Sequence, residues 1–380
     1  MISLAGYQVK EALYESNQSI IYRGLRTVDQ QPVILKLLNR DYPTQAEITQ
    51  FKREYEIVKD LNLAGVTQSY HLERHGNSSI IIMEDLGGQA LSSFIPTWQF
   101  DLTNFLKLAI QITGAIDEIH QKNIIHKDIN PSNIIYNPAT NQVKLIDFGI
   151  STILARENTS PQNPNILEGT LAYISPEQTG RVNRSIDYRT DFYSLGVTLY
   201  ELLTGQLPFT TKDALALVHA HIAKHPIAPH EINPQIPVVV SNIVTKLLSK
   251  TVEERYQSAY GLKRDLEEVL IQWQKQGSIT TFPLARYDIS NKFQIPQKLY
   301  GREEELSLLL ETFDKVSLGS REMFLVSGDS GIGKSALIHE IHKPLLARQG
   351  YFVTGKFDQF KRDTPYTSLI QAFQDLMRQV

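Results

Sequence analysis

The spacing of hydrophobic and polar residues divides the chain into a strand-rich beginning, a helical middle and a separate last part. Within the first 90 or so residues, short runs of β-branched residues predict strands at 20–22, 33–35 and 79–83. Between the second and third strands, apolar residues recur at helical spacing over 46–63, which predicts one helix. This pattern predicts strands interrupted by one helix.

From about residue 100 the pattern becomes mainly helical. Asp101 is suited to cap a helix that continues to Gln121, with one apolar stripe along its length. Residues 151–170 are polar and contain two prolines, which predicts a long loop. The remaining predicted elements are short strands at 134–136 and 143–146, and helices at 187–204, 211–224, 236–249 and 258–273.

The hydrophobic period is lost after residue 273. Residues 274–298 contain Gly277, Pro283 and Pro296 and show no period, so we interpret them as a linker. A new unit begins at residue 299. Its predicted elements are a helix at 303–315, a strand at 323–327, a glycine-rich turn at 328–333 and a helix at 334–347. A strand, a glycine-rich turn and a helix in this order are typical of phosphate-binding folds.

Composition narrows the functional classes. The chain has 380 residues, of which 42% are hydrophobic and 21% charged, as expected for a globular protein. Its net charge of −3 argues against nucleic acid as a partner. The absence of cysteine excludes disulfides and cysteine-ligated zinc. We find neither a membrane-spanning run nor a secretory signal, so we expect a cytoplasmic protein.

Several short motifs follow one another in a fixed order. They are Val33-Ile34-Leu35-Lys36, Glu54, His126-Lys127-Asp128-Ile129-Asn130-Pro131-Ser132-Asn133, Asp147-Phe148-Gly149, and Gly169-Thr170-Leu171-Ala172-Tyr173-Ile174-Ser175-Pro176-Glu177. With these motifs, residues 7–273 resemble the eukaryotic-type protein kinase domain. The resemblance implies an α+β, bilobal fold with a β-rich N-lobe over 1–86 and a helical C-lobe over 87–273.

The resemblance implies a role for each polar residue in these motifs. Lys36 would bind the α- and β-phosphates of ATP, held by an ion pair with Glu54. Asp147 and Asn133 would bind Mg²⁺, a hard cation that prefers oxygen ligands. Asp128 would accept or orient the proton of the substrate hydroxyl.

The resemblance also implies supporting positions. Glu177, at the end of the activation segment, would pair with Arg255. Asp191 would support the catalytic loop, which runs from His126 to Asn133. The backbone of a hinge would meet the adenine. That hinge consists of Met83, Glu84, Asp85 and Leu86.

Three departures from the family pattern concern activity rather than fold. Tyr14, Ser16 and Ser19 stand where the glycines of the phosphate-covering loop would fall. Asn130 replaces a lysine that contacts the γ-phosphate, although an amide can also donate a hydrogen bond. Lys127 replaces an arginine. Two interpretations therefore remain open: an active protein kinase, or a pseudokinase that serves as a regulatory scaffold.

The activation segment indicates the substrate class. The run from Gly169 to Tyr173 resembles the pattern of Ser/Thr-specific protein kinases. The following Ser-Pro-Glu and Asp191 disfavour a small-molecule phosphotransferase. Thr159, Ser160 and Thr170 are candidate phosphorylation sites.

The glycine-rich turn near the end of the sequence fits a second nucleotide motif, the P-loop. Backbone NH groups from Gly328 to Gly333 would surround phosphate, Lys334 would reach the β- and γ-phosphates, and Ser335 would hold Mg²⁺. Both parts of the chain therefore imply ATP and Mg²⁺ as cofactors.

We expect residues 299–380 to be an incomplete α/β P-loop unit, because a P-loop sheet needs further strands. They resemble signal-transduction ATPases with numerous domains. The order of a kinase and then this ATPase resembles very large bacterial sensor proteins that continue into GAF and histidine kinase domains. We therefore expect protein substrates and further domains downstream in the same chain.

Overall fold

The computed structural model describes most of the chain. The described residues are 4–16, 19–39, 42–97, 100–153, 169–182, 184–211, 213–289, 301–329, 331–341, 344–345, 350–355 and 366–379. Thr159 and Ser160, two candidate phosphorylation sites, lie outside this part of the chain.

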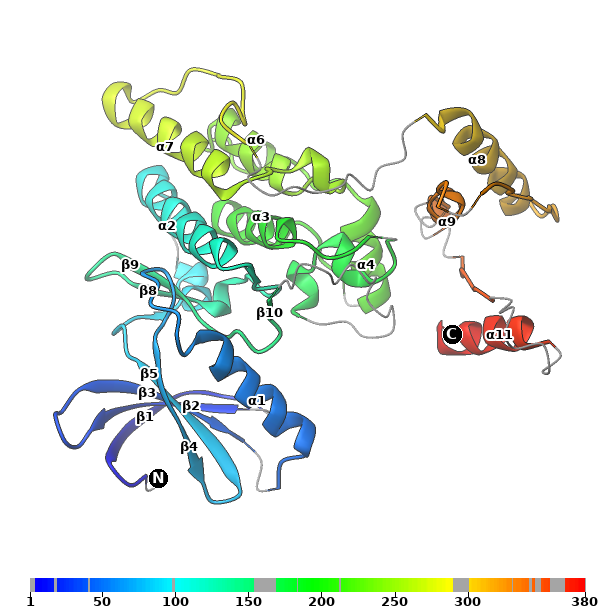
Figure 1. The fold of residues 1–380 in the computed structure, drawn as a ribbon. Helices are drawn as coiled ribbons and strands as arrows, with labels where there is room; N and C mark the ends of the chain where they lie inside the picture. Colours follow the sequence, from blue (N-terminus) through cyan, green and yellow to red (C-terminus); the bar gives the residue numbers. More distant parts are fainter. Residues whose placement is uncertain are drawn as a thin grey trace.

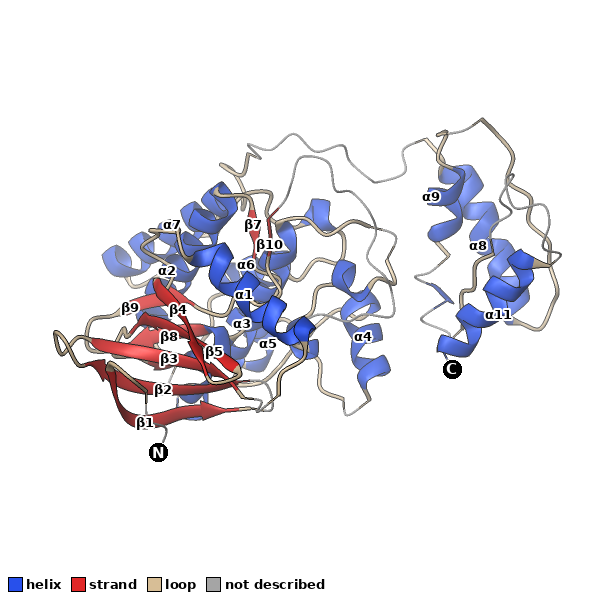
Figure 2. Cartoon of the chain, turned by 60° about the horizontal axis from the view of Figure 1, so that its bottom comes forward, coloured by secondary structure: helices blue, strands red, loops and turns tan. Residues whose placement is uncertain are grey.

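The N-lobe is a five-stranded antiparallel sheet with one helix against it (Figures 1 and 2). The strand order is β1-β2-β3-β5-β4, so the predicted strands form the centre of the sheet. Residues of β3 and β5 are almost fully buried, which explains their continuous apolar sequence. The elements are β1 (Tyr7–Glu15), β2 (Ser19–Arg26), β3 (Pro32–Leu38), α1 (Gln45–Val58), β4 (Ser69–His75) and β5 (Ser78–Glu84).

Helix α1 begins at a capping box. The Thr44 hydroxyl accepts a hydrogen bond from the amide of Glu47, whose carboxylate accepts one from the amide of Thr44. Phe51 packs with Met83 and other residues on one side of the sheet. Glu54 is also buried, so the helix carries a charged side chain towards the junction with the C-lobe.

The C-lobe is built around two long buried helices, α2 (Leu102–Gln121) and α3 (Arg189–Thr204). Asp101 caps α2 as predicted, accepting hydrogen bonds from the amides of Thr103 and Asn104. The other helices are α4 (Ala214–Ala223), α5 (Pro229–Ile232), α6 (Val238–Leu247) and α7 (Ala259–Gln276). Short strands pair as β6-β8-β9 and β7-β10, with β6 (Gln89–Ala90), β7 (Ile124–Ile125), β8 (Ile134–Asn137), β9 (Gln142–Leu145) and β10 (Thr152–Ile153). The predicted bilobal α+β fold is confirmed.

The segment between α1 and β4 joins the two lobes. Gly65 lies against α2 so closely that a β-carbon there would be 2.4 Å from that of Ala115. Its amide donates to Glu118 of α2 at 2.8 Å, and its carbonyl accepts from the amide of Leu145 at 2.8 Å. These contacts fix the entry of β4 relative to the loop that follows β9.

The segment after α7 folds back along that helix, where the sequence predicted a linker. Helix α7 ends at Gly277, which has φ 62°. The chain then turns towards the beginning of α7 (yellow in Figure 1). Ile279, Phe282 and Leu284 pack against the core of the C-lobe. Residues 277–289 are thus attached to this lobe.

The last part of the chain contains α8 (Glu303–Ser317), α9 (Lys334–His339) and α11 (Thr367–Gln379). Helix α8 agrees with the prediction, and α9 is shorter than the predicted 334–347. The predicted strand at 323–327 is wrong, because these residues form no strand in the described chain. A strand needs a hydrogen-bonded neighbour, and Met323 and Leu325 are instead 84% and 85% exposed. Among the described residues, no helix has the length and apolar character needed to cross a bilayer.

A buried ion pair joins the segment before α3 to the segment before α7. Arg255 donates to both carboxylate oxygens of Glu177, at 2.6 and 2.8 Å, and both side chains are almost fully buried. Thr190 donates to the same carboxylate at 2.8 Å. Burial alone would raise the pKa of Glu177, but the charge of Arg255 outweighs it and lowers this pKa to about 2.

We expect Glu177→Gln to lower the free energy of unfolding at pH 7 by about 3–5 kcal/mol, because it leaves a buried arginine unpaired. The folded pKa lies below the ordinary value of 4.5, so the pair stabilises the fold above that pH and loses this effect as pH falls towards 2. The difference between wild type and variant should therefore shrink at pH 3.

Urea unfolding followed by tryptophan fluorescence measures this difference, since both tryptophans, Trp98 and Trp273, precede the last part of the chain. Glu254→Gln is the matched control, because Glu254 is exposed. A loss below about 1 kcal/mol, as exposed pairs give, or a difference that does not change with pH, would contradict this assignment.

Candidate active site

Three charged side chains from different elements meet where the two lobes join. Lys36 of β3 lies 2.6 Å from Glu54 of α1 and 3.2 Å from Asp147, which follows β9. The side chains of Lys36 and Glu54 are 9% and 8% exposed, whereas that of Asp147 is 45% exposed. The lysine is therefore held from inside the protein, and the aspartate is open to a ligand.

The charges of these groups stabilise one another. Burial alone would lower the pKa of Lys36, but Glu54 and Asp147 outweigh this effect and raise it, so the lysine is protonated. The charge of Lys36 in turn lowers the pKa of Asp147. The site thus presents a fixed cation beside an exposed carboxylate.

Asp128 lies in a loop whose polar groups hold its carboxylate in place. Asn133 donates to its Oδ2 at 2.9 Å, and the amide of Thr170 donates to its Oδ1 at 2.9 Å. The side-chain nitrogen Nδ2 of Asn130 donates to the Asp128 carbonyl at 3.1 Å and to the Thr170 hydroxyl at 3.3 Å. Sequence reasoning considered Thr170 only as a modification site, whereas the structure gives it contacts to the catalytic loop.

Asp191 of α3 supports this loop from below. Its carboxylate accepts hydrogen bonds from the amides of His126 and Lys127 at 2.9 and 2.8 Å, and lies 2.8 Å from Nε2 of His120. Asp191 is fully buried. Lys127 has φ 69°, a left-handed conformation that is uncommon for a residue with a side chain. The hydrogen bonds to Asp191 offset the strain of this turn.

The predicted hinge lies at the end of β5. Met83 is buried, and the backbone of Glu84 donates from its amide to the carbonyl of Gln68 at 2.9 Å. The carbonyl of Leu86 accepts from Asn137 at 2.8 Å. The sequence analysis did not identify Asn137. The only signal for it in the sequence is a polar residue at the end of a predicted strand.

The turn between β1 and β2 occupies the place of the family's glycine-rich loop. The hydroxyl of Ser16 donates to the Ser19 carbonyl at 3.1 Å, and the amide of Ser19 donates to the Ser16 hydroxyl at 3.0 Å. Asn39, which sequence reasoning also missed, donates to the Ser16 carbonyl at 2.6 Å. The Ser16 side chain therefore bonds the backbone of Ser19 across this turn, whose tip at 17–18 lies outside the described residues.

The predicted P-loop forms the turn before α9. Gly328, Gly331 and Gly333 have φ of 155°, 84° and 99°, a region that favours glycine. Lys334 is the first residue of α9, and its Nζ donates to the carbonyls of Gly328 and Asp329 at 2.8 and 2.7 Å. Ser335 follows on the helix. The loop and its lysine are thus in contact, but the strand predicted before them is absent.

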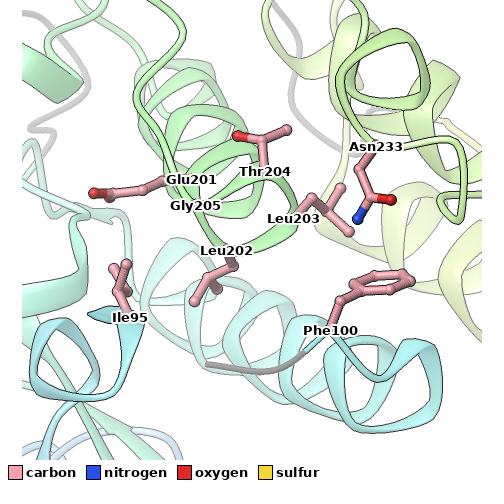
Figure 3. A pocket seen from close by; sticks show the side chains of 8 residues that line it. All are labelled: Ile95, Phe100, Glu201, Leu202, Leu203, Thr204, Gly205 and Asn233. Carbon is pink, nitrogen blue, oxygen red and sulfur yellow. The ribbon is translucent and has the colours of Figure 1, made fainter. Parts of the chain in front are cut away.

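A separate cavity of about 180 Å³ lies at the end of α3 and contains none of the predicted site residues (Figure 3). Glu201 lines it and accepts a hydrogen bond from Tyr173 at 2.5 Å. The other lining residues are Ile95, Phe100, Leu202, Leu203, Thr204, Gly205 and Asn233.

Comparison with known proteins agrees with this geometry. Residues 7–266 match the model of the protein kinase domain, and residues 298–380 match that of an AAA ATPase domain. The chain is 34% identical to hybrid signal transduction histidine kinase G of Dictyostelium discoideum over 73% of this chain and 10% of that protein.

Two bacterial relatives match over about two thirds of the chain. The identity is 30% to serine/threonine-protein kinase PrkC of Bacillus subtilis, over 69% of this chain and 40% of that protein. It is 32% to serine/threonine-protein kinase PknB of Mycobacterium tuberculosis, over 69% of this chain and 42% of that protein. The chain thus spans about a tenth to two fifths of the length of these relatives. The match over residues 7–266 shows that this chain belongs to the protein kinase family, with an AAA ATPase domain following the kinase domain.

Proposed function

We propose that the chain transfers the γ-phosphate of ATP to Ser or Thr hydroxyls of proteins, in a signalling protein that also carries a nucleotide-binding AAA domain. The observation that carries this proposal is the assembled contact of Lys36 with both Glu54 and Asp147, beside an Asp128 that is already oriented. Phosphoryl transfer depends chiefly on such positioning and on neutralisation of phosphate charge.

The oxygen-bearing residues suit Mg²⁺. Asp147 offers an exposed carboxylate. Asn133 uses its amide nitrogen to donate to Asp128, which leaves its Oδ1 as the atom for a cation. Mg²⁺ would neutralise the β- and γ-phosphates when bound. Ser335 would be the corresponding oxygen ligand of the P-loop.

ATP would lie with its phosphates at Lys36 and its adenine at the hinge. Lys36 is protonated and already held by Glu54, so it would bind the α- and β-phosphates with little reorganisation. The backbone groups of Met83, Glu84 and Leu86 would meet the adenine. The serine-closed turn after β1 would cover the phosphates less closely than glycine allows.

Asp128 would act on the substrate hydroxyl. Its two oxygens are held by Asn133 and by the Thr170 amide, so its orientation is set before substrate binds. It would accept the hydroxyl proton as the oxygen attacks phosphorus. Asn130 stands in the place of the usual lysine. Its side-chain nitrogen already donates to the Asp128 carbonyl and to Thr170, so Asn130 would support Asp128 rather than contact the γ-phosphate.

The relatives do not support the pseudokinase alternative. Those that match the first part of the chain are described as Ser/Thr protein kinases. The contacts of Lys36 with Glu54 and Asp147, and of Asn133 with Asp128, also support an active enzyme. We therefore favour an active enzyme despite Asn130 and the missing glycines.

The wider organisation is also a proposal. We assign the kinase N-lobe to 1–86 and the start of the ATPase domain to 299–380. The sequence predicted a C-lobe over 87–273 and a linker over 274–298. We extend the C-lobe to residue 289, because α7 continues to Gln276 and the segment after it packs against this lobe. The exposed Met323 and Leu325 support completion of the ATPase sheet by further residues of the protein. We propose protein substrates, downstream domains in the same chain and a cytoplasmic location, where Mg-ATP is available.

We expect the wild-type chain to transfer phosphate from Mg-ATP to a generic basic protein. Asp128→Asn should lower kcat by about 10²–10⁴-fold, the range for loss of a general base. The Kd for Mg-ATP should not change, because Asp128 touches the hydroxyl rather than the nucleotide. Radiolabel incorporation and equilibrium dialysis measure the two quantities.

Asp60→Asn is the matched control for this experiment, because Asp60 is exposed at the end of α1. Binding of Mg-ATP by the wild type without any phosphate transfer would overturn the proposal in favour of a pseudokinase.

The P-loop generates a separate prediction. We expect the full protein to bind two molecules of a non-hydrolysable ATP analogue, one at each motif. Lys334→Ala should remove one, because it deletes the cation that reaches the β- and γ-phosphates. Lys36→Met should remove the other.

Lys315→Ala on α8 is the control, since Lys315 is an exposed lysine in the same domain. A stoichiometry of one in the wild type, or of two in Lys334→Ala, would contradict a nucleotide site at this loop.

A further inference from the structure

Residues 277–289, which we call the strap, lie between the ranges that match the two families, 7–266 and 298–380. The strap nevertheless makes regular contacts along α7. The amide of Thr280 donates to Gln272 at 2.9 Å, and the amide of Ala285 donates to Asp265 at 2.7 Å. The strap therefore runs antiparallel to the helix, from its end back to its beginning.

Asp288 anchors the far end of the strap. Its carboxylate accepts hydrogen bonds from the amide of Gln257 at 2.6 Å and from the hydroxyl of Ser258 at 2.7 Å. Ser258 is the residue that caps α7. Asp288 thus binds at the junction between α7 and the loop before it.

The sequence makes room for this anchor at Gly261. A β-carbon at Gly261 would lie 2.6 Å from the Cα, Cβ and Oδ1 of Asp288. Glycine is otherwise unfavourable within a helix. Its presence in the first turn of α7 is explained by the close approach of Asp288.

Gln257 connects this anchor to α3. The carbonyl of Gln257 accepts from the Tyr188 hydroxyl at 2.7 Å, and its Oε1 accepts from Arg189 at 2.5 Å. Two residues beyond Arg189, the carboxylate of Asp191 accepts hydrogen bonds from the backbone amides of His126 and Lys127. Three hydrogen-bonded contacts, joined by the turn of α3 from Arg189 to Asp191, therefore link the strap to the catalytic loop.

A second route starts from the middle of the strap. Asp265, which holds the amide of Ala285, also accepts the hydroxyl of Tyr256 at 2.6 Å. Tyr256 follows Arg255, the partner of Glu177 at the end of the activation segment. The strap thus contacts Gln257 directly and reaches Tyr256 through Asp265, and these two residues directly follow Arg255.

We propose that the strap is an integral part of the kinase domain, and that Asp288 is a positioning residue that holds the catalytic loop through Gln257 and α3. Release of the strap loosens the loop and lowers the rate of phosphate transfer. Asp288 is also the strap's last anchor before the ATPase domain in the sequence. The effect on transfer rests on the proposed kinase function, whereas the effect on the loop does not.

Two variants of the whole chain release the strap in different ways. Asp288→Ala removes the anchor. Gly261→Ala places a methyl group against Asp288 but favours the helix itself, so it does not weaken α7. Gly114→Ala in α2 is the matched control, because the nearest atom to a β-carbon there is the Lys263 Nζ at 3.9 Å.

Hydrogen exchange and steady-state kinetics give the readouts. We expect both variants to exchange faster in 277–289, and the amides of His126 and Lys127 to exchange at least tenfold faster. We expect kcat to fall at least fivefold with KM for ATP unchanged, and amides of the sheet at 69–84 to exchange as in the wild type. Gly114→Ala should match the wild type throughout.

Four results would overturn the proposal. In the first two, amides of the strap exchange faster, but either the amides of His126 and Lys127 exchange as in the wild type or kcat of an active enzyme is unchanged. In the third, amides at 69–84 exchange faster to the same extent as those of the loop. In the fourth, neither variant speeds exchange in the strap. If the wild type transfers no phosphate but loop exchange still rises in both variants, the positioning role stands and the proposed activity fails.

Discussion

The catalytic loop depends on one fully buried carboxylate, that of Asp191. It accepts two backbone amides of the loop and lies 2.8 Å from the His120 ring. A buried carboxylate is costly unless it is fully hydrogen-bonded, so these partners and the aspartate require one another. The loop can then hold Lys127 at a positive φ and present Asp128 above it. Asp191 thereby connects the buried helix α3 to the loop that carries Asp128.

The same arrangement explains how the proposed activity would tolerate the departures from the family pattern. Lys36 is fixed by Glu54 and Asp147, independently of the turn that would cover ATP. Asn130 does not need to replace a lysine's charge to support Asp128, because its amide bonds the Asp128 carbonyl and caps the following turn. The groups that we propose to contact phosphate are thus held by the fold rather than by the residues that differ from the family pattern.

The sequence predicts those elements whose pattern is local. Helix α2 and its cap at Asp101 follow from spacing and side-chain chemistry alone. The ion pair of Lys36 with Glu54 was implied only by family resemblance, since 18 residues separate them. The prediction of a strand at 323–327 was wrong, because a strand needs a hydrogen-bonded neighbouring strand and Leu325 is exposed instead. The strap has no hydrophobic period, so only tertiary contacts such as those of Asp288 reveal its place.

The most direct test of this account is the rate of phosphate transfer by Asp191→Asn, measured beside the wild type at saturating Mg-ATP. The amide keeps the size of the side chain but removes one acceptor and the charge. The account predicts measurable transfer by the wild type, and at least about a 100-fold lower kcat in the variant with an unchanged Kd for ATP, because a 1 Å misplacement of reacting groups costs about this much. Equal rates in two folded proteins, or no transfer by the wild type, would contradict it.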